Sequence, residues 1–114
     1  MTFSNVLAHV EVQDFQAGVN WYTTLLGRAP DRRPMDGCVE WQITGSGGIQ
    51  LYAGESAPCT VIIGVDDANE FATELTTRGL RADVMTVPSG QFRVATIKDP
   101  AQNTLLFTQS MGDE

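Results

Sequence analysis

The amino-acid sequence carries one local plan twice, about 53 residues apart. In each half an alternating pattern ends at a short acidic motif, Val12-Gln13-Asp14 and then Val65-Asp66-Asp67, and a helical pattern follows. The pair Thr23-Thr24 recurs at the same offset as Thr76-Thr77. A repeat of this kind predicts a fold built from two similar modules.

The first half reads as a strand, a helix and further strands. Residues Leu7 to Gln13 alternate between apolar and polar side chains, which predicts a half-buried strand. Asp14 has the short acceptor side chain of a helix N-cap, and the apolar positions that follow at helical spacing end at Gly27. Further strands are predicted at 39–43 and 49–52, with a tight turn over 45–48 and an unplaced strand around Arg33.

The second half repeats this order. An apolar strand at 60–65 leads to a cap at Asp67 and to a helix that Gly79 terminates. Three more strands are predicted at 82–85, 92–97 and 104–108. The predicted class is α+β, with two βαβββ modules of about residues 1–55 and 56–114 in a single domain. A ferredoxin-like fold with extra strands is the alternative.

Length and charge limit the possible partners. A chain of 114 residues with 42% hydrophobic side chains is sufficient for one domain. The formal net charge of -7 repels nucleic acids and anionic membranes, and it would attract cationic molecules. No basic leader and no apolar run near the ~18 residues of a membrane span is present, so we predict a cytoplasmic protein. Cys38 and Cys59 are too few for a disulfide framework and are predicted to be reduced structural thiols.

Several short motifs resemble those of one known superfamily. The pattern from Val12 to Gly27, with Asp14-Phe15 at its start and Tyr22 inside it, resembles the opening of the glyoxalase/bleomycin resistance protein/dioxygenase (vicinal oxygen chelate) superfamily. Val65-Asp66-Asp67, Asp99-Pro100 and Asn103 resemble its second half. This resemblance implies that eight strands form a curved sheet around a ligand-binding cleft, and that the protein is a homodimer.

The resemblance also places four positions where metal-dependent members carry ligands. Here they are Leu7 and Thr60 on the first strand of each module, and Gln50 and Leu106 on the last. Since a divalent cation needs about three or four N, O or S donors, we predict no metal and no other cofactor. A displaced site that recruits His9, Glu11 and Gln50 is the alternative.

The same alignment predicts which residues line the cleft. Trp41 either adds an aromatic face to it or packs in the core, because Trp41 and its neighbours Glu40 and Gln42 point to opposite sides of one strand. The predicted ligand-binding residues are Leu7, His9, Glu11, Trp41, Gln50, Tyr52, Thr60, Ile62, Leu106 and Thr108.

Two functions are compatible with such a cleft. One is a metal-independent binding protein for a small aromatic or cationic molecule. The other is a metal-independent lyase or isomerase in which His9 and Glu11, about 6–7 Å apart along one strand face, transfer a proton. The first is favoured, because polar neighbours on one strand face are common in proteins without catalytic activity.

Overall fold

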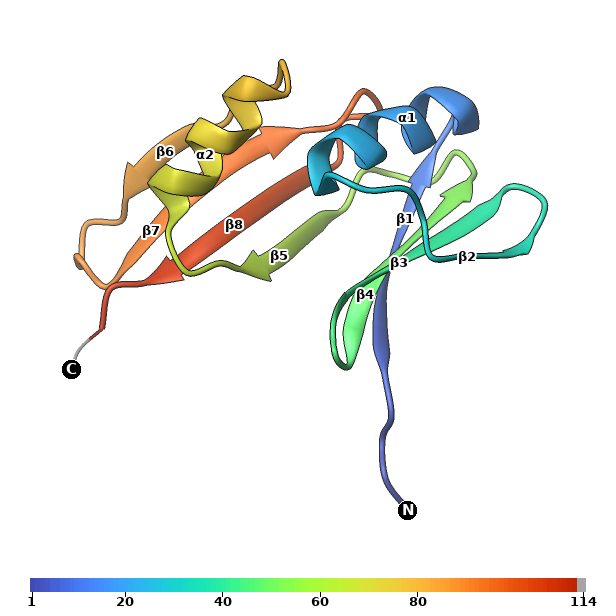
Figure 1. Ribbon diagram of the computed structural model, residues 1–114, viewed down its shortest axis with the longest axis horizontal. Coiled ribbons are helices and arrows are strands. Elements are labelled where there is room, and N and C mark those ends of the chain that lie inside the picture. Colours follow the sequence, from blue (N-terminus) through green and yellow to red (C-terminus); the bar gives the residue numbers. More distant parts are fainter. Residues whose placement is uncertain (113–114) are drawn as a thin grey trace. The chain divides into compact units, whose positions relative to one another are not determined.

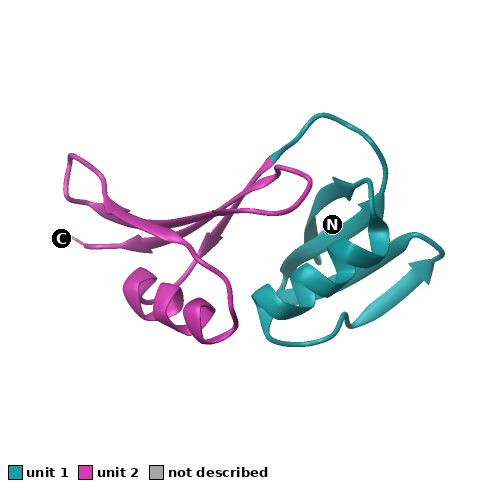
Figure 2. Cartoon of the chain, turned by 90° about the horizontal axis from the view of Figure 1, so that it is seen from above, with its two compact units in different colours: residues 1–59 teal, residues 60–114 magenta. Residues whose placement is uncertain are grey.

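The computed structural model describes residues 1–112, which form two compact units divided between Cys59 and Thr60. Each unit contains one helix and a four-stranded mixed sheet, in the order strand, helix and three strands. In Figure 2 the helix of each unit lies along one face of its own sheet. The predicted α+β class and the βαβββ plan of both modules are therefore confirmed.

The first unit contains a sheet with the strand order β1-β4-β3-β2 (Figure 1). Strand β1 pairs in parallel with β4, whereas the other pairs are antiparallel. The expected strand near Arg33 is β2, and it forms the edge of the sheet. The elements are β1 (Val6–Val12), α1 (Phe15–Leu26), β2 (Arg32–Met35), β3 (Cys38–Thr44) and β4 (Gly47–Ala53).

Helix α1 begins and ends where the sequence predicts. The Asp14 carboxylate accepts a hydrogen bond from the Ala17 backbone N–H at 3.1 Å, and Gly27 ends the helix with a φ of 78°, in the left-handed region that favours glycine. Gly18 lies in the middle of the helix, where a methyl group would press against Val12 and Leu51. This glycine allows α1 to approach the sheet closely.

The α1-facing side of the first sheet forms the core of this unit. Val10, Trp41 and Leu51 have no exposed surface, and Tyr22 of α1 places its ring 6.0 Å from that of Trp41. The opposite face of the sheet carries the polar partners of the alternating patterns. Burial of the apolar face thus determines which side chains remain available for a ligand.

The predicted turn between β3 and β4 is shorter than expected. Gly47 and Gly48 belong to β4, and the turn itself is Gly45-Ser46. A side chain at Gly48 would overlap the Trp41 carbonyl oxygen, and the register of the two strands shifts between Gln42 and Thr44. Glycine is required here because two backbones approach closely beside a bulge. The predicted turn over 45–48 did not include this role of Gly48.

The second unit repeats the arrangement with the strand order β5-β8-β7-β6. Helix α2 is capped by Asp67, whose carboxylate accepts from the Glu70 backbone N–H at 3.0 Å. Phe71 of the helix packs on Phe107 of the sheet, with the two rings 4.4 Å apart. The elements are β5 (Thr60–Gly64), α2 (Ala68–Thr77), β6 (Asp83–Thr86), β7 (Phe92–Lys98) and β8 (Thr104–Ser110).

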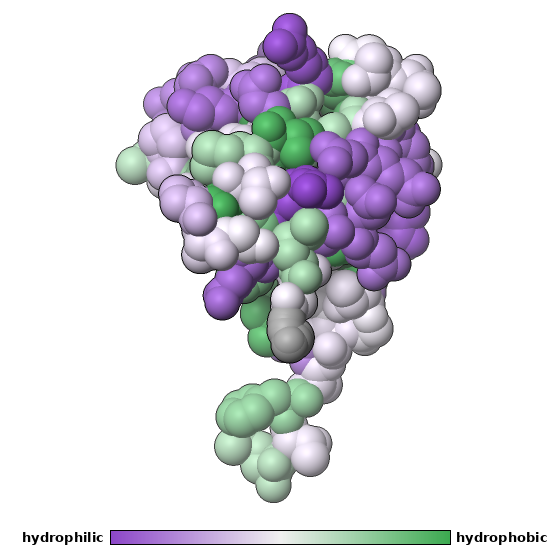
Figure 3. All heavy atoms as spheres, turned by 90° about the vertical axis from the view of Figure 1, so that its left-hand side faces the viewer, coloured by the Kyte–Doolittle hydropathy of each residue, from purple (hydrophilic) through white to green (hydrophobic). Residues whose placement is uncertain are grey.

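Hydrophilic side chains cover much of the side drawn in Figure 3, and hydrophobic ones gather in groups between and below them. Between residues 1 and 112, no helix combines the length and the apolar character needed to cross a bilayer.

Cys38 and Cys59 are both free thiols, and burial together with the nearby Glu40 raises the pKa of Cys38.

Candidate functional site

Four of the predicted site residues meet on the face of the first sheet that α1 leaves uncovered. Strand pairing places His9 opposite Gln50, and Glu11 opposite Tyr52, on β1 and β4. Paired residues of neighbouring strands point to the same face of a sheet. Leu7 shares this face, two residues before His9, and is partly exposed.

A continuous set of hydrogen bonds crosses this face, and we call it the polar row: Arg32, Glu40, Gln50, His9 and Glu11. His9 Nε2 lies 2.9 Å from Glu11 Oε2, and His9 Nδ1 lies 2.8 Å from Gln50 Oε1. The Gln50 amide nitrogen donates to Glu40 Oε2 at 3.0 Å. The Arg32 guanidinium donates to Glu40 Oε1 at 2.7 Å. The polar row therefore spans all four strands of the first sheet.

An aromatic ring borders the polar row. The Tyr52 ring lies 5.4 Å from the His9 ring, centre to centre, and is tilted from it by 43°. The His9 side chain is 48% exposed, and Tyr52 is partly exposed. This part of the sheet combines flat rings with charged groups, as small-molecule sites commonly do.

Hydrogen bonds within the polar row shift the pKa values of His9, Glu11 and Glu40. The hydrogen bond to Glu11, followed by the one to Gln50, raises the pKa of His9. The hydrogen bond from His9 and a second from the Ser56 backbone N–H lower the pKa of Glu11. Glu40 is only 7% exposed, and the Gln50 amide and Arg32 lower its pKa. Both carboxylates therefore favour their ionised form more strongly than a free carboxyl group does, and the protonated form of His9 is favoured more than in a free imidazole.

The predicted separation of about 6–7 Å between the His9 and Glu11 side chains is wrong, because the two groups lie 2.9 Å apart. Alternate residues of a strand are about 6–7 Å apart. The flexible Glu11 side chain bridges that gap and reaches the imidazole directly. The segment after β4 also holds Glu11, because Ser56 donates its backbone N–H to Glu11 Oε1 at 3.1 Å.

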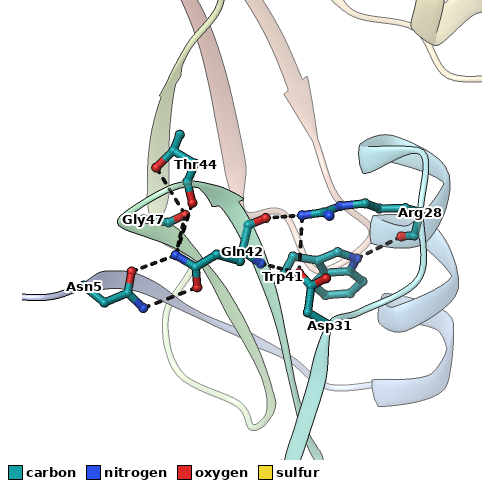
Figure 4. A network of polar contacts seen from close by, with 7 residues as sticks. All are labelled: Asn5, Arg28, Asp31, Trp41, Gln42, Thr44 and Gly47. Carbon is teal, nitrogen blue, oxygen red and sulfur yellow. Dashed lines mark hydrogen bonds and ion pairs between the residues drawn. The ribbon is translucent and has the colours of Figure 1, made fainter.

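Trp41 lies on the other side of the sheet. It is fully buried and contacts Tyr22. Figure 4 shows its indole N–H, which donates to the Arg28 carbonyl at 2.9 Å. Trp41 therefore packs in the core and does not line the candidate ligand-binding face. The reason is the strand period of two, since burying Trp41 against α1 turns Glu40 and Gln42 to the opposite face.

A second network of polar contacts fixes the end of β3 near this tryptophan (Figure 4). The Arg28 guanidinium donates to the Gln42 carbonyl, and Asp31 accepts from the Gln42 backbone N–H at 2.6 Å. The Gln42 side chain exchanges hydrogen bonds with Asn5, which lies just before β1. These contacts hold β3, the strand that carries Glu40. None of them uses a residue of the polar row.

The remaining predicted residues lie together in the second unit, on the face of its sheet that α2 leaves uncovered. Ile62 pairs with Leu106, and Thr60 and Thr108 lie two residues away on the same two strands. Ile62 is 68% exposed, whereas Leu106 and Thr108 are partly exposed. Ile62 and Leu106 occupy the places that His9 and Gln50 hold in the first unit, so the equivalent surface here is apolar.

Sequence reasoning left Glu40 open as the alternative to Trp41 and missed Arg32, another member of the polar row. The strand period of two allowed either Trp41 or Glu40 on this face. Arg32 could not be predicted, because β2 has no hydrophobic alternation and all four of its residues are exposed. Only pairing with β3 places Arg32 opposite Glu40.

Solved structures of other proteins share this architecture. A glyoxalase/bleomycin resistance protein from Catenulispora acidiphila aligns with a TM-score of 0.84 at 26% identity, over 92% of this chain and 96% of that one. A bleomycin-binding protein in complex with bleomycin aligns at 0.76 and 18% identity, over 93% and 98%. A bleomycin resistance determinant encoded on the transposon Tn5 aligns at 0.77 and 18% identity, over 95% and 98%.

No model of a known protein family matches the chain, and no curated protein matches its sequence significantly. Two βαβββ modules, each with one sheet face open, nevertheless define a fold of the vicinal oxygen chelate type. The chain thus has the fold of the glyoxalase/bleomycin resistance protein/dioxygenase superfamily, as its short motifs predict.

The residues at the superfamily's metal positions do not fit a metal ion. Leu7 and Leu106 have no donor atoms, and both polar atoms of the Gln50 amide already bind His9 and Glu40. Thr60 then contributes the single remaining oxygen, which is too few donors for a divalent cation. Over the described part of the chain, no three side chains among His, Cys, Asp and Glu gather closely enough to hold a metal ion.

Proposed function

We propose that this protein binds a small molecule without a metal ion, against the polar row and Tyr52. The observation that carries the proposal is the continuous polar row beside an exposed aromatic ring on an uncovered sheet face. Aromatic and cationic molecules are the candidate ligands, since Tyr52 offers a ring and the chain carries a net charge of -7. One protein with the same fold binds bleomycin, and another is a bleomycin resistance determinant. Both support a binding role for this protein.

Proton transfer is the second candidate function. The 2.9 Å contact between His9 and Glu11 favours it, because a carboxylate that fixes an imidazole is a common arrangement in general acid-base catalysis. In this alternative the protein is a lyase or isomerase. His9 moves the proton, and Glu11 or Gln50 stabilises the charge that develops.

His9→Gln separates these two functions. The variant keeps a hydrogen-bonding side chain of similar length but has no group that titrates near neutral pH. A binding protein should keep most of its affinity, since Gln still offers a hydrogen-bonding group at this position. An enzyme should lose about 100-fold or more in turnover. Gln13→Ala, at an exposed position just after β1, is the control and should change neither affinity nor turnover.

Metal independence has its own test. The metal content of protein purified without chelator or affinity tag should be negligible, and its melting temperature should stay constant when Ni²⁺, Zn²⁺, Mn²⁺ or Fe²⁺ is added. A tightly held metal, or a rise of several degrees with one ion, would contradict the proposal and favour a displaced site at His9.

The proposal includes a cytoplasmic homodimer, as the superfamily resemblance implies. Sedimentation equilibrium of the full chain should give twice the mass of 12.4 kDa. A monomer at all concentrations would remove the dimer from the proposal and leave the binding function unaffected.

A further inference from the structure

Both ring nitrogens of His9 point at oxygen atoms. Nδ1 lies 2.8 Å from Gln50 Oε1, and Nε2 lies 2.9 Å from Glu11 Oε2. A neutral imidazole has one N–H donor and one bare acceptor nitrogen, so it satisfies two acceptors only when it carries a second proton. The directions of the two hydrogen bonds therefore decide the charge of this histidine.

The direction of the Gln50 contact follows from Glu40. An ionised carboxylate only accepts hydrogen bonds, and Glu40 is ionised because Arg32 pairs with it at 2.7 Å. Gln50 must therefore turn its NH₂ group toward Glu40, which leaves its carbonyl oxygen facing His9. Nδ1 of His9 must carry a proton to bond with that oxygen.

The direction of the Glu11 contact is determined in the same way. Glu11 Oε1 accepts the Ser56 backbone N–H at 3.1 Å, and Oε2 faces His9. Two donors on one carboxylate stabilise its ionised form. Nε2 of His9 must then also carry a proton, since a bare nitrogen would face a negative oxygen.

We infer that His9 is held as an imidazolium, and that the site takes a flat, electron-rich ring that is neutral or anionic, lying on the His9 and Tyr52 rings. This inference rests on the proposed binding function and narrows its ligand class. It removes small cations from the candidates, although the net charge of the chain favours them.

The ring faces are the part of His9 that stays available. Both N–H groups are occupied within the polar row, yet the side chain remains 48% exposed. A cation attracts the negative face of an aromatic ring and repels another cation. Tyr52 adds a second ring at an angle of 43° and carries a hydroxyl group at the far end of that ring. That hydroxyl can bond with a polar group on the edge of the ligand.

Other charged groups near His9 do not reverse this preference. Glu11 on β1 and Glu40 on β3 are negative, but Ser56, Gln50 and Arg32 occupy their oxygen atoms. The charges of Arg32, Glu40, His9 and Glu11 sum to zero. A ligand above the ring of His9 therefore contacts the cation of the polar row more closely than either carboxylate.

The charge of His9 can be measured without a ligand. Nitrogen-15 chemical shifts of the His9 ring in the full-length protein at pH 7 should report both nitrogens as mainly protonated, and His9 is the single histidine of the chain. In Glu11→Gln the ring should become mainly neutral. One bare nitrogen in the unmodified protein at pH 7 would overturn the inference, whatever the protein binds.

The ligand class is tested with two probes of similar size, neutral indole and cationic benzyltrimethylammonium. Indole should shift the His9 ring protons in a saturable way and bind about 10-fold or more tightly than the cation. In His9→Phe, which keeps a flat ring without charge, the affinity for indole should fall about 3-fold to 30-fold and the difference between probes should disappear.

The outcomes separate this inference from the proposed function. Tighter binding of the cation at His9, or the absence of any indole effect on the His9 ring, would overturn the inference. In either case a thermal-shift screen of small molecules decides independently whether the protein binds a ligand at all. The binding part of the proposed function fails when that screen finds no ligand.

Discussion

Gly54 lies against the Glu11 side chain, immediately after β4. A methyl group at this position would overlap Glu11 Oε1. The backbone N–H of Gly54 donates to the Val12 carbonyl at 3.0 Å. At the scale of single residues, the position of Glu11 therefore depends on a residue that has no side chain. Ser56 and His9 then hold the two carboxylate oxygens.

Gly54→Ala should displace Glu11 from His9 while the fold persists, because the group in the way is the end of a flexible side chain. The pKa of His9 should fall toward its ordinary value, since the hydrogen bond to Glu11 is the main cause of its increase. An NMR titration of the His9 ring measures this. Gly64→Ala is the matched control, because a methyl group there meets no atom within 4 Å. An unchanged pKa in Gly54→Ala would contradict the role given to Gly54.

Protonation of His9 should also make stability depend on pH. The pKa of His9 is raised in the folded protein, so its contribution is fully present below about pH 6.5 and is lost as the pH rises through the folded value. The free energy of unfolding in urea should therefore fall more between pH 6 and pH 9 for the unmodified protein than for His9→Gln. Equal slopes would show that the polar row does not favour the imidazolium.

At the scale of elements, the helix caps and the glycines determine where segments begin and end. Asp14 and Asp67 each cap a helix through a single hydrogen bond to a backbone N–H. In the second unit the Gln109 side chain also accepts from the Ala68 N–H at 2.9 Å, so β8 satisfies another donor of α2. These contacts fix the start of α2 relative to its own sheet.

Asp67→Ala should destabilise the protein by about 1 kcal/mol, the usual effect of removing an N-cap acceptor. Asp66→Ala is a control one residue away, and Asp66 is exposed. Its effect should stay within about 0.5 kcal/mol. Urea unfolding of both variants measures the difference, and equal losses would mean that Asp67 does not act as a cap.

At the scale of the whole molecule, the two units are expected to unfold together. Each has its own apolar core, around Trp41 in the first and Phe107 in the second. The prediction that they form one domain requires a single cooperative transition. Both tryptophans, Trp21 and Trp41, belong to the first unit, so fluorescence reports on that unit alone.

We propose that tryptophan fluorescence and far-ultraviolet circular dichroism will give the same urea midpoint. Phe107→Ala in the second unit should cost about 3–5 kcal/mol and shift both midpoints equally. Leu75→Ala, in the same core, should shift both in the same way by about 2–5 kcal/mol. A fluorescence midpoint that ignores these changes would establish two independent units.

Local patterns were sufficient for much of the fold. Both helix caps, the glycine after α1 and the alternation of β1 were all predictable, because N-caps, left-handed glycines and periods of two or 3.6 involve residues close in sequence. The bounds and pairing of β2 and the extent of the turn before β4 were not. A short exposed edge strand and a close backbone contact leave no periodic signal.

The candidate site divides in the same way. Alternation along β1 and β4 placed His9, Glu11, Gln50 and Tyr52 on common faces, which depends only on sequence neighbours. Tertiary pairing alone decided that His9 meets Gln50, 41 residues away, and that Glu40 and Arg32 complete the polar row. Packing of Trp41 against α1 turned Glu40 toward Gln50. The physical reason is that strand register and the choice of buried face arise from contacts between distant segments, which no local pattern encodes.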